Sequence, residues 1–202
     1  MTADVHTSRQ PHARLYPKLL GSAWSGLHPE VQRVHTRPGS TRAQAQLEVR
    51  RAPGRLLGLM LNLAQVPKAA GHARVRLVIV ERTTPHGPQE CWHRVFDGQP
   101  LVTHQCEAPG GLLSERVGPL EFRFRLLAED GTMLFEQHGC WLRAGRLAVR
   151  LPRALTPIIW CRESATDMPD QTSVHVRVSA PSGRLLFSYR GTVTWNVSQE
   201  TR

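Results

Sequence analysis

The sequence lacks the features that mark several common classes of protein. No apolar run approaches the roughly 18 residues needed to cross a bilayer, and the first residues do not have the basic-then-apolar layout of a secretory signal. Neither GxGxxG nor GxxxxGK(S/T) occurs, which argues against nucleotide binding through glycine-rich loops. We therefore expect a cytoplasmic protein with no membrane span, no cofactor and reduced cysteines.

Lysine is nearly absent as well. Lys18 and Lys68 are the only two, so arginine supplies the rest of the 26 basic residues, and the net charge is +10. Such a charge can attract nucleic acid, anionic lipid or an acidic protein partner. The arginines are scattered from Arg9 to Arg202, however, with no basic run of five or more, as arginine-rich codon usage would also produce. We expect no nucleic-acid binding, and peripheral contact with a membrane stays open.

The segment 111–142 predicts a long antiparallel hairpin. Asp130-Gly131 favours the positive φ of a tight turn and lies between two alternating runs. One face of the hairpin is then apolar, and the other is charged, with Arg125 opposite Glu136. The pairs expected on the apolar face are Leu126 with Phe135, Phe124 with Gln137, Phe122 with Gly139 and Leu120 with Trp141.

The remaining patterns predict a mostly β protein of the α+β class. A helical period begins at Tyr16, and Pro29 divides it into two short helices. A helix is also expected from Pro53 to Pro67, either plugging the sheet or forming a lid. Strands are expected at residues 44–50, 73–83, 90–96, 101–107, 112–117, 120–128, 132–142, 146–150, 157–164, 173–180 and 184–195.

These elements imply one β-rich domain over residues 14–197, between disordered tails at 1–13 and 198–202. So many consecutive hairpins make a meander, and a twisted sheet of this size must curl. The expected architecture is a large curved antiparallel sheet, either a barrel or a half-barrel, with the short N-terminal helices packed on it.

Several motifs resemble a bacterial family catalogued as domain of unknown function 4166. The resemblance runs from about Leu15 to about Trp195. It rests on LYPKLLGSAWSGLHPEVQRVH, CWHRVFDG, LLSERVGPLEFRFRL, LPRALTP and FSYRG, which include Trp92-x-Arg94-x-Phe96, Glu115-Arg116-x-Gly118-Pro119 and Tyr189-x-Gly191. In that family the domain stands alone or follows a saccharopine-dehydrogenase-like, NADP-binding domain. The resemblance implies a standalone accessory module with an oxidoreductase partner, and it implies no catalytic residues.

Alternation places Trp92, Arg94 and Phe96 on one strand face. If that face lines a cavity, Arg94 is a cation between aromatic walls and suits a carboxylate or phosphate. The structural alternative is that Arg94 stacks on Trp92, or pairs with Glu115 or Glu163. The candidate ligand-binding residues, taken from this face and from the apolar faces of the hairpins, are Trp92, Arg94, Phe96, Glu115, Phe122, Phe124 and Tyr189.

Glu115 is the candidate catalytic residue. A tight turn at Gly118-Pro119 would put Glu115 beside Phe122 on the apolar face, where a carboxylate needs a partner or a raised pKa. If that corner is not tight, Glu115 faces the outside. No catalytic triad can be assembled, since Ser114 lacks the GxSxG elbow that exposes a nucleophile.

Two cysteines and two histidines are the candidate metal ligands. A turn at Gly98-Gln99 would set His93 opposite His104 and Cys91 opposite Cys106, all on one face. These are ligand types that zinc prefers. Because four side chains on a flat ladder diverge, we expect no metal, and the reducing compartment argues against a disulfide.

The leading functional hypothesis is a noncatalytic module that binds a lipid-like or other apolar small molecule in a cavity of the curled sheet. A second hypothesis is a cyclase- or hydrolase-like cavity enzyme that uses Glu115 with Arg94. A third is a scaffold whose sheet docks an NADP-dependent oxidoreductase.

Overall fold

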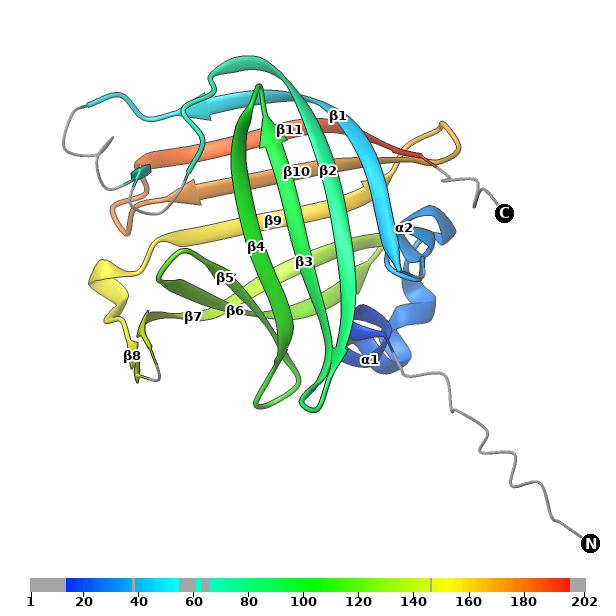
Figure 1. Cartoon of the computed structure of the whole chain (residues 1–202), viewed down its shortest axis with the longest axis horizontal. Coiled ribbons are helices and arrows are strands. Elements are labelled where there is room, and N and C mark those ends of the chain that lie inside the picture. The colour runs from blue at the N-terminus through cyan, green and yellow to red at the C-terminus, as the bar shows by residue number, and fades with distance from the viewer. Residues whose placement is uncertain (1–13, 38, 55–60, 63–65, 146, 197–202) are drawn as a thin grey trace, which may run out of the picture.

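The chain forms a closed antiparallel β-barrel, capped at one end by helices (Figure 1). The computed structural model describes residues 14–37, 39–54, 61–62, 66–145 and 147–196. The strands are β1 (Ser40–Arg51), β2 (Gly71–Thr84), β3 (Gly87–Phe96), β4 (Gln99–Ala108), β5 (Leu112–Val117), β6 (Leu120–Glu129), β7 (Thr132–Ala144), β8 (Leu147–Arg150), β9 (Ile158–Ala165), β10 (Gln171–Ser179) and β11 (Leu185–Asn196).

The strand order is β6-β5-β4-β3-β2-β1-β11-β10-β9-β7, and pairing of β6 with β7 closes the ring. Strand β8 pairs with β7 alone and lies outside the ring. The predicted curved antiparallel sheet is therefore confirmed, and of the two forms left open it is the barrel. Closure removes the free edges of the ten ring strands, which an open sheet would leave unpaired.

Strict alternation of side chains explains where the core lies. In β1, Ala43, Ala45, Leu47 and Val49 are buried, and the residues between them are exposed or half-buried. Because successive side chains of a strand point to opposite faces, every second residue of each ring strand enters the barrel. The interior is thus mostly apolar, and most arginines of the strands lie on the outer face.

The turn at Asp130-Gly131 forms as predicted, with φ of 48° and 76° at these two residues. Leu126 faces Phe135, and Arg125 faces Glu136. The local preference of this dipeptide for positive φ therefore sets the register of the first half of the hairpin.

A β-bulge in β7 makes the rest of the predicted pairing wrong. The register shifts because His138 is an extra residue without a partner on β6. The shift buries Cys140 in the core and places Trp141 outside, where the guanidinium of Arg123 lies 4.0 Å from its ring centroid. The pairs that result are Phe122 with Cys140 and Leu120 with Leu142, in place of the predicted partners Gly139 and Trp141.

Short helices close one end of the barrel, as Figure 1 shows at the right. They are α1 (Leu15–Leu20), the 3-10 helix η1 (Gly21–Gly26) and α2 (Pro29–Val34). The backbone N–H of His28 donates to the carbonyl oxygen of Gly131 at 2.9 Å, which ties the helices to the β6–β7 turn. The two predicted short helices divided at Pro29 are confirmed. Among the described residues, no helix is long and apolar enough to span a membrane.

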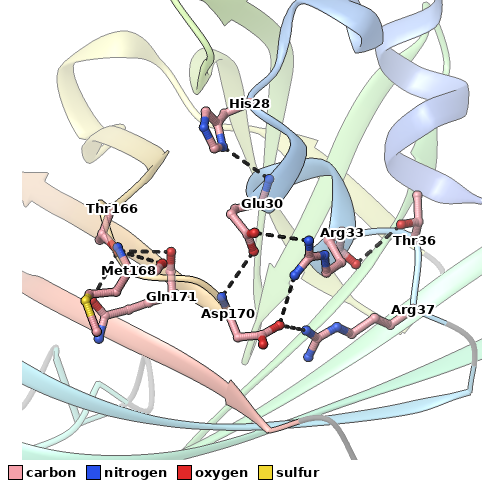
Figure 2. Close-up of polar contacts among 9 residues, drawn as sticks. All are labelled: His28, Glu30, Arg33, Thr36, Arg37, Thr166, Met168, Asp170 and Gln171. Atoms are coloured by element: carbon pink, nitrogen blue, oxygen red, sulfur yellow. Dashed lines mark hydrogen bonds and ion pairs between the residues drawn. The ribbon is translucent and has the colours of Figure 1, made fainter.

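An ion cluster fastens α2 to the connection between β9 and β10 (Figure 2). Asp170 accepts from Arg33 at 3.2 Å and from Arg37 at 3.0 Å. Glu30 pairs with Arg33 at 3.1 Å and accepts from the backbone N–H of Asp170 at 3.3 Å. These contacts hold the cap over the barrel end between segments far apart in the sequence.

The opposite end of the barrel, which we call the open end, is not covered by α1, η1 or α2. The C-terminal end of β1 and the N-terminal end of β2 lie there, on the left in Figure 1. The helix predicted from Pro53 to Pro67 falls largely on residues 55–60 and 63–65, which lie outside the described residues. Leu61 and Val66, which are described, line the cavity discussed below.

Candidate functional site

The barrel encloses a cavity of about 190 Å³ with mostly apolar walls. Its residues come from the inward positions of the strands, from α1 at the capped end and from the β1–β2 connection at the open end. The apolar wall is formed by Leu61, Val66, Leu101, Val117, Leu120, Phe122, Phe135, Pro157, Ile159, Val174, Val176, Val178, Leu186 and Phe187.

Polar side chains gather toward the capped end of this cavity. The hydroxyl of Tyr16 donates to Gln105 Oε1 at 2.7 Å. Nε2 of His35 lies 3.1 Å from Glu163 Oε2, and both side chains are almost fully buried. The second oxygen of Glu163 and Nδ1 of His35 have no hydrogen-bond partner in the described part of the chain. The capped end therefore holds a buried acid–histidine pair with unused hydrogen-bonding capacity.

Arg94 and Glu115 meet at the cavity wall, where they form its charged pair. Arg94 Nη2 lies 4.0 Å from Glu115 Oε1, Arg94 Nη1 donates to Thr103 at 3.0 Å, and the guanidinium lies 4.7 Å from the ring centroid of Trp92. Burial alone would lower the pKa of Arg94, but Tyr189 and Glu115 raise it overall, so the cation persists. Arg94 thus makes both of the structural contacts considered from the sequence, the stacking and the ion pair, while lining the cavity.

The tight corner on which Glu115 depends is present. Val117 faces Leu120, Glu115 faces Phe122, and Gly118 adopts a positive φ of 53°. Glu115 therefore enters the barrel, and its side chain is 21% exposed.

Three other titratable groups on the wall, Tyr16, Tyr189 and Cys161, stay neutral. Burial raises the pKa of Tyr16 and that of Tyr189, so both phenols remain protonated hydrogen-bond donors at neutral pH. Burial also raises the pKa of the Cys161 thiol well above its ordinary value. A thiol held in this form is a poor nucleophile, so Cys161 acts as an apolar wall residue.

Five of the seven candidate ligand-binding residues line the cavity: Trp92, Arg94, Glu115, Phe122 and Tyr189. Phe96 and Phe124 are fully buried in the core beside it and are not among the lining residues.

Sequence reasoning missed the polar residues of the capped end. Thr103 and Gln105 alternate with Leu101, so the same period-two pattern could have placed them inside. Tyr16 and His35 had no such signal, since only the docking of the helices brings them to the barrel.

The predicted pairing of the candidate metal ligands is wrong by two residues. The turn uses Asp97 and Gly98, both with positive φ, instead of Gly98-Gln99. Cys91 therefore faces His104, His93 faces Val102 and Cys106 faces Gln89. Cys91 Sγ and His93 Nε2 are 3.1 Å apart, yet no group of three or more metal-ligating side chains forms among the described residues.

A closed ten-stranded antiparallel barrel with a helical cap and an internal cavity is the class that this fold and site define. Within it, the chain belongs to the family described as "Domain of unknown function (DUF4166)", whose model matches residues 27–193. The resemblance seen in the sequence motifs is thereby confirmed. A search of the curated proteins finds no match.

Two solved structures show a distant similarity. One is a protein of unknown function from the DUF3598 family of Nostoc punctiforme PCC 73102, with 11% identity and a TM-score of 0.39. That match covers 77% of this chain and 46% of the other, so this chain spans about half the length of that protein. The second, an N-terminal dehydratase from the difficidin assembly line, has 9% identity and a TM-score of 0.18, with 83% and 80% covered. Both TM-scores are too low to support a conclusion about function.

Proposed function

We propose that this barrel is a noncatalytic module that binds a small apolar molecule in its interior. The observation that carries the proposal is the cavity of about 190 Å³, with an apolar wall and one charged pair, Arg94 and Glu115, set into it. Apolar cavities lined by a few convergent polar groups are the common form of small-molecule sites. The wall supplies the binding energy, and the charged pair orients a polar group of the ligand.

The volume of the cavity limits the size of the ligand. A cavity of roughly 150 Å³ lined by apolar side chains accepts benzene in another protein, whereas drug-sized ligands occupy roughly 300–1,000 Å³. The interior here fits one or two rings or a short acyl chain, and a longer lipid-like molecule would project through the open end past Leu61 and Val66.

Extraction of the purified protein, followed by mass spectrometry, tests for a co-purifying apolar molecule. Binding is then measured with the fluorescent apolar probe N-phenyl-1-naphthylamine, of which two rings can occupy the cavity while the third projects toward the open end. We expect the probe to brighten on binding, and we expect Val176→Trp, which fills the cavity, to abolish that signal.

Val102→Trp is the matched control, because Val102 is half-buried on the outer face of β4 and should leave probe binding unchanged. An empty extract together with a probe signal that is absent, or equal in both variants, would overturn the proposal. Thermal melts show whether each variant is folded.

A cyclase- or hydrolase-like role for Glu115 is the second candidate function. It is favoured by one observation: the Glu115 carboxylate is open to the cavity beside a persistent cation. General acid–base work needs a carboxyl within reach of the bound molecule. Turnover of a ligand identified by extraction, lost in Glu115→Gln, would favour this role over simple binding.

We also propose a cytoplasmic location, and an oxidoreductase partner is the alternative to a bound ligand. A cytoplasmic setting is in keeping with four free cysteines among the described residues. The scaffold hypothesis, in which the barrel docks an NADP-dependent oxidoreductase, is tested by co-purification: a stable reductase complex with a ligand-free barrel would replace the binding proposal.

A further inference from the structure

Exposed apolar side chains gather around the open end of the barrel. Of the seven large apolar residues that are exposed in the described part of the chain, six lie between residues 142 and 160. The seventh, Met168, belongs to the β9–β10 connection at the capped end. We use the name rim strip for the six residues and two exposed arginines between them, namely Leu142, Leu147, Val149, Arg150, Arg153, Leu155, Ile158 and Trp160.

The rim strip adjoins the mouth of the cavity. Leu142 pairs with Val149 of β8 and with Leu120, which lines the cavity. Cross-strand partners share a face, so the β7–β8 hairpin extends the cavity wall beyond the ring. Ile158 and Trp160 alternate with cavity-lining residues of β9 and therefore face outward. In Figure 1, β8 and the turn that follows it lie at the end opposite the helices.

The charge of this end is positive. Residues 137–162 contain no aspartate or glutamate, and the Arg153 side chain makes no ion pair or hydrogen bond with the described residues. Lys68 and Arg184 are exposed in other connections at this end, and Asp97 is the one acidic residue in its described connections. The helices and described connections of the capped end contain Glu30, Asp130, Asp167 and Asp170, and Glu107 and Glu129 lie at the ends of the strands there.

We propose that the rim strip docks the open end of the barrel onto a membrane surface that contains anionic phospholipid. Protruding apolar side chains enter the headgroup boundary, and the neighbouring arginines bind lipid phosphates. Charge complementarity selects this occupant over a second copy of the chain, because two copies joined through the same strip would bring together two positive surfaces with no carboxylate in either. Docking in this orientation would place the mouth of the cavity against the lipid.

Flotation of the full chain with vesicles tests the proposal. We expect binding to vesicles of phosphatidylcholine mixed with phosphatidylglycerol, little binding to phosphatidylcholine alone, and weaker binding as salt is raised. Arg153→Glu and Leu155→Glu should each reduce binding about tenfold, since each replaces an attractive contact with a repelled charge.

Matched substitutions at the capped end serve as controls. Met168→Glu and Arg82→Glu change equally exposed residue types on the far side of the molecule and should leave vesicle binding unchanged. Absence of binding to anionic vesicles, or equal losses at both ends, would overturn the proposal. So would a dimer that Leu155→Glu dissociates, or strip-dependent binding of nucleic acid or an acidic protein in its place. Because Leu155 and Arg153 do not line the cavity, this test can fail while the ligand-binding proposal stands.

Discussion

Glu115 and Glu121 lie on neighbouring strands but face opposite sides of the wall. Glu115 enters the cavity, 4.0 Å from Arg94, and keeps part of its surface open. Glu121 faces outward and is almost fully buried between Arg123 and Arg143, which both donate to its carboxylate. Although burial opposes it, hydrogen bonds from Arg143 and Arg123 lower the pKa of Glu121. The same residue type therefore has a ligand-facing setting on one strand and a structural setting on the next.

Glu115→Gln should keep the fold and change binding. Because 4.0 Å is too long for a hydrogen bond, and Arg94 keeps its bond to Thr103 and its stacking on Trp92, the ion pair with Arg94 should contribute no more than about 1 kcal/mol. The amide keeps the size of the carboxyl and removes its charge, so we expect an altered affinity for N-phenyl-1-naphthylamine with nearly unchanged thermal stability.

Glu121→Gln is the contrasting control, expected to lose about 3 kcal/mol of stability because the buried Glu121 carboxylate is hydrogen-bonded to both Arg123 and Arg143, with probe binding intact. A large stability loss from Glu115→Gln would show instead that Glu115 serves mainly to neutralise Arg94. A variant silent in both measurements would remove Glu115 from the site.

The buried carboxyl of Glu90 predicts that the stability of the protein depends on pH. Its carboxylate accepts from Trp92 Nε1 at 2.8 Å, and burial raises its pKa above the ordinary 4.5. A carboxyl with a raised pKa binds its proton more tightly in the folded state, so its stabilising contribution is complete below pH 4.5 and is lost as pH rises through the folded-state pKa. Glu90→Gln should therefore melt higher than the parent at neutral pH, with the difference vanishing in acid. A constant difference across the pH range would contradict this.

Among the strands, the β1–β11 pair shows a close backbone approach. Gly191 has a φ of +153°, and a Cβ there would lie 2.1 Å from the carbonyl oxygen of Gln46. Neither strand can move without breaking its backbone hydrogen bonds to its neighbours. Gly191→Ala should therefore lower the free energy of unfolding by about 3 kcal/mol or more, as measured by chemical denaturation. Gly26→Ala, whose Cβ meets Ala128 at an ordinary 3.7 Å, should cost less than about 1 kcal/mol. Similar small losses would mean that β1 and β11 can shift apart.

The seam between β7 and β9 is the shortest pairing of the ring, with three residue pairs. Beyond it, the Gln137 side chain bridges the strands, donating to the carbonyl oxygen of Pro157 at 2.9 Å and accepting from the N–H of Ile159 at 2.6 Å. Gln137→Ala should cost about 2 kcal/mol for two lost hydrogen bonds and should speed amide exchange at Ile159. Glu136→Ala, at the exposed neighbouring residue, should change neither the stability nor the amide exchange at Ile159. Unchanged exchange in both variants would show that the β7–β9 seam does not need the Gln137 bridge.

For the molecule as a whole, the assignment of inner and outer faces is open to a simple test. Phe122 is 4% exposed and packs in the core, whereas Arg125, on the same strand, points to solvent. Phe122→Ala should cost about 3–5 kcal/mol of unfolding free energy, and Arg125→Ala less than about 1 kcal/mol. Comparable small effects in urea denaturation would contradict a barrel with this interior.

The sequence by itself determined the strands, their faces and most turns, because these depend on neighbours along the chain. Alternation placed Trp92 and Arg94 on one face, and the Asp130-Gly131 turn fixed the register as far as Gln137. The site residues Arg94 and Glu115 could be named for the same reason. The pairing register after His138 could not be predicted, since the β-bulge has no local sequence signal here.

Only the tertiary structure decided which strands close the ring and what meets inside it. Pairing of β1 with β11, and contact of Tyr16 with Gln105, join segments remote in the sequence. The pairing of His35 with Glu163 likewise depends on docking of the helical cap. The physical reason is that local backbone preferences and side-chain periodicity act over a few residues, whereas barrel closure and burial are properties of the whole packed chain.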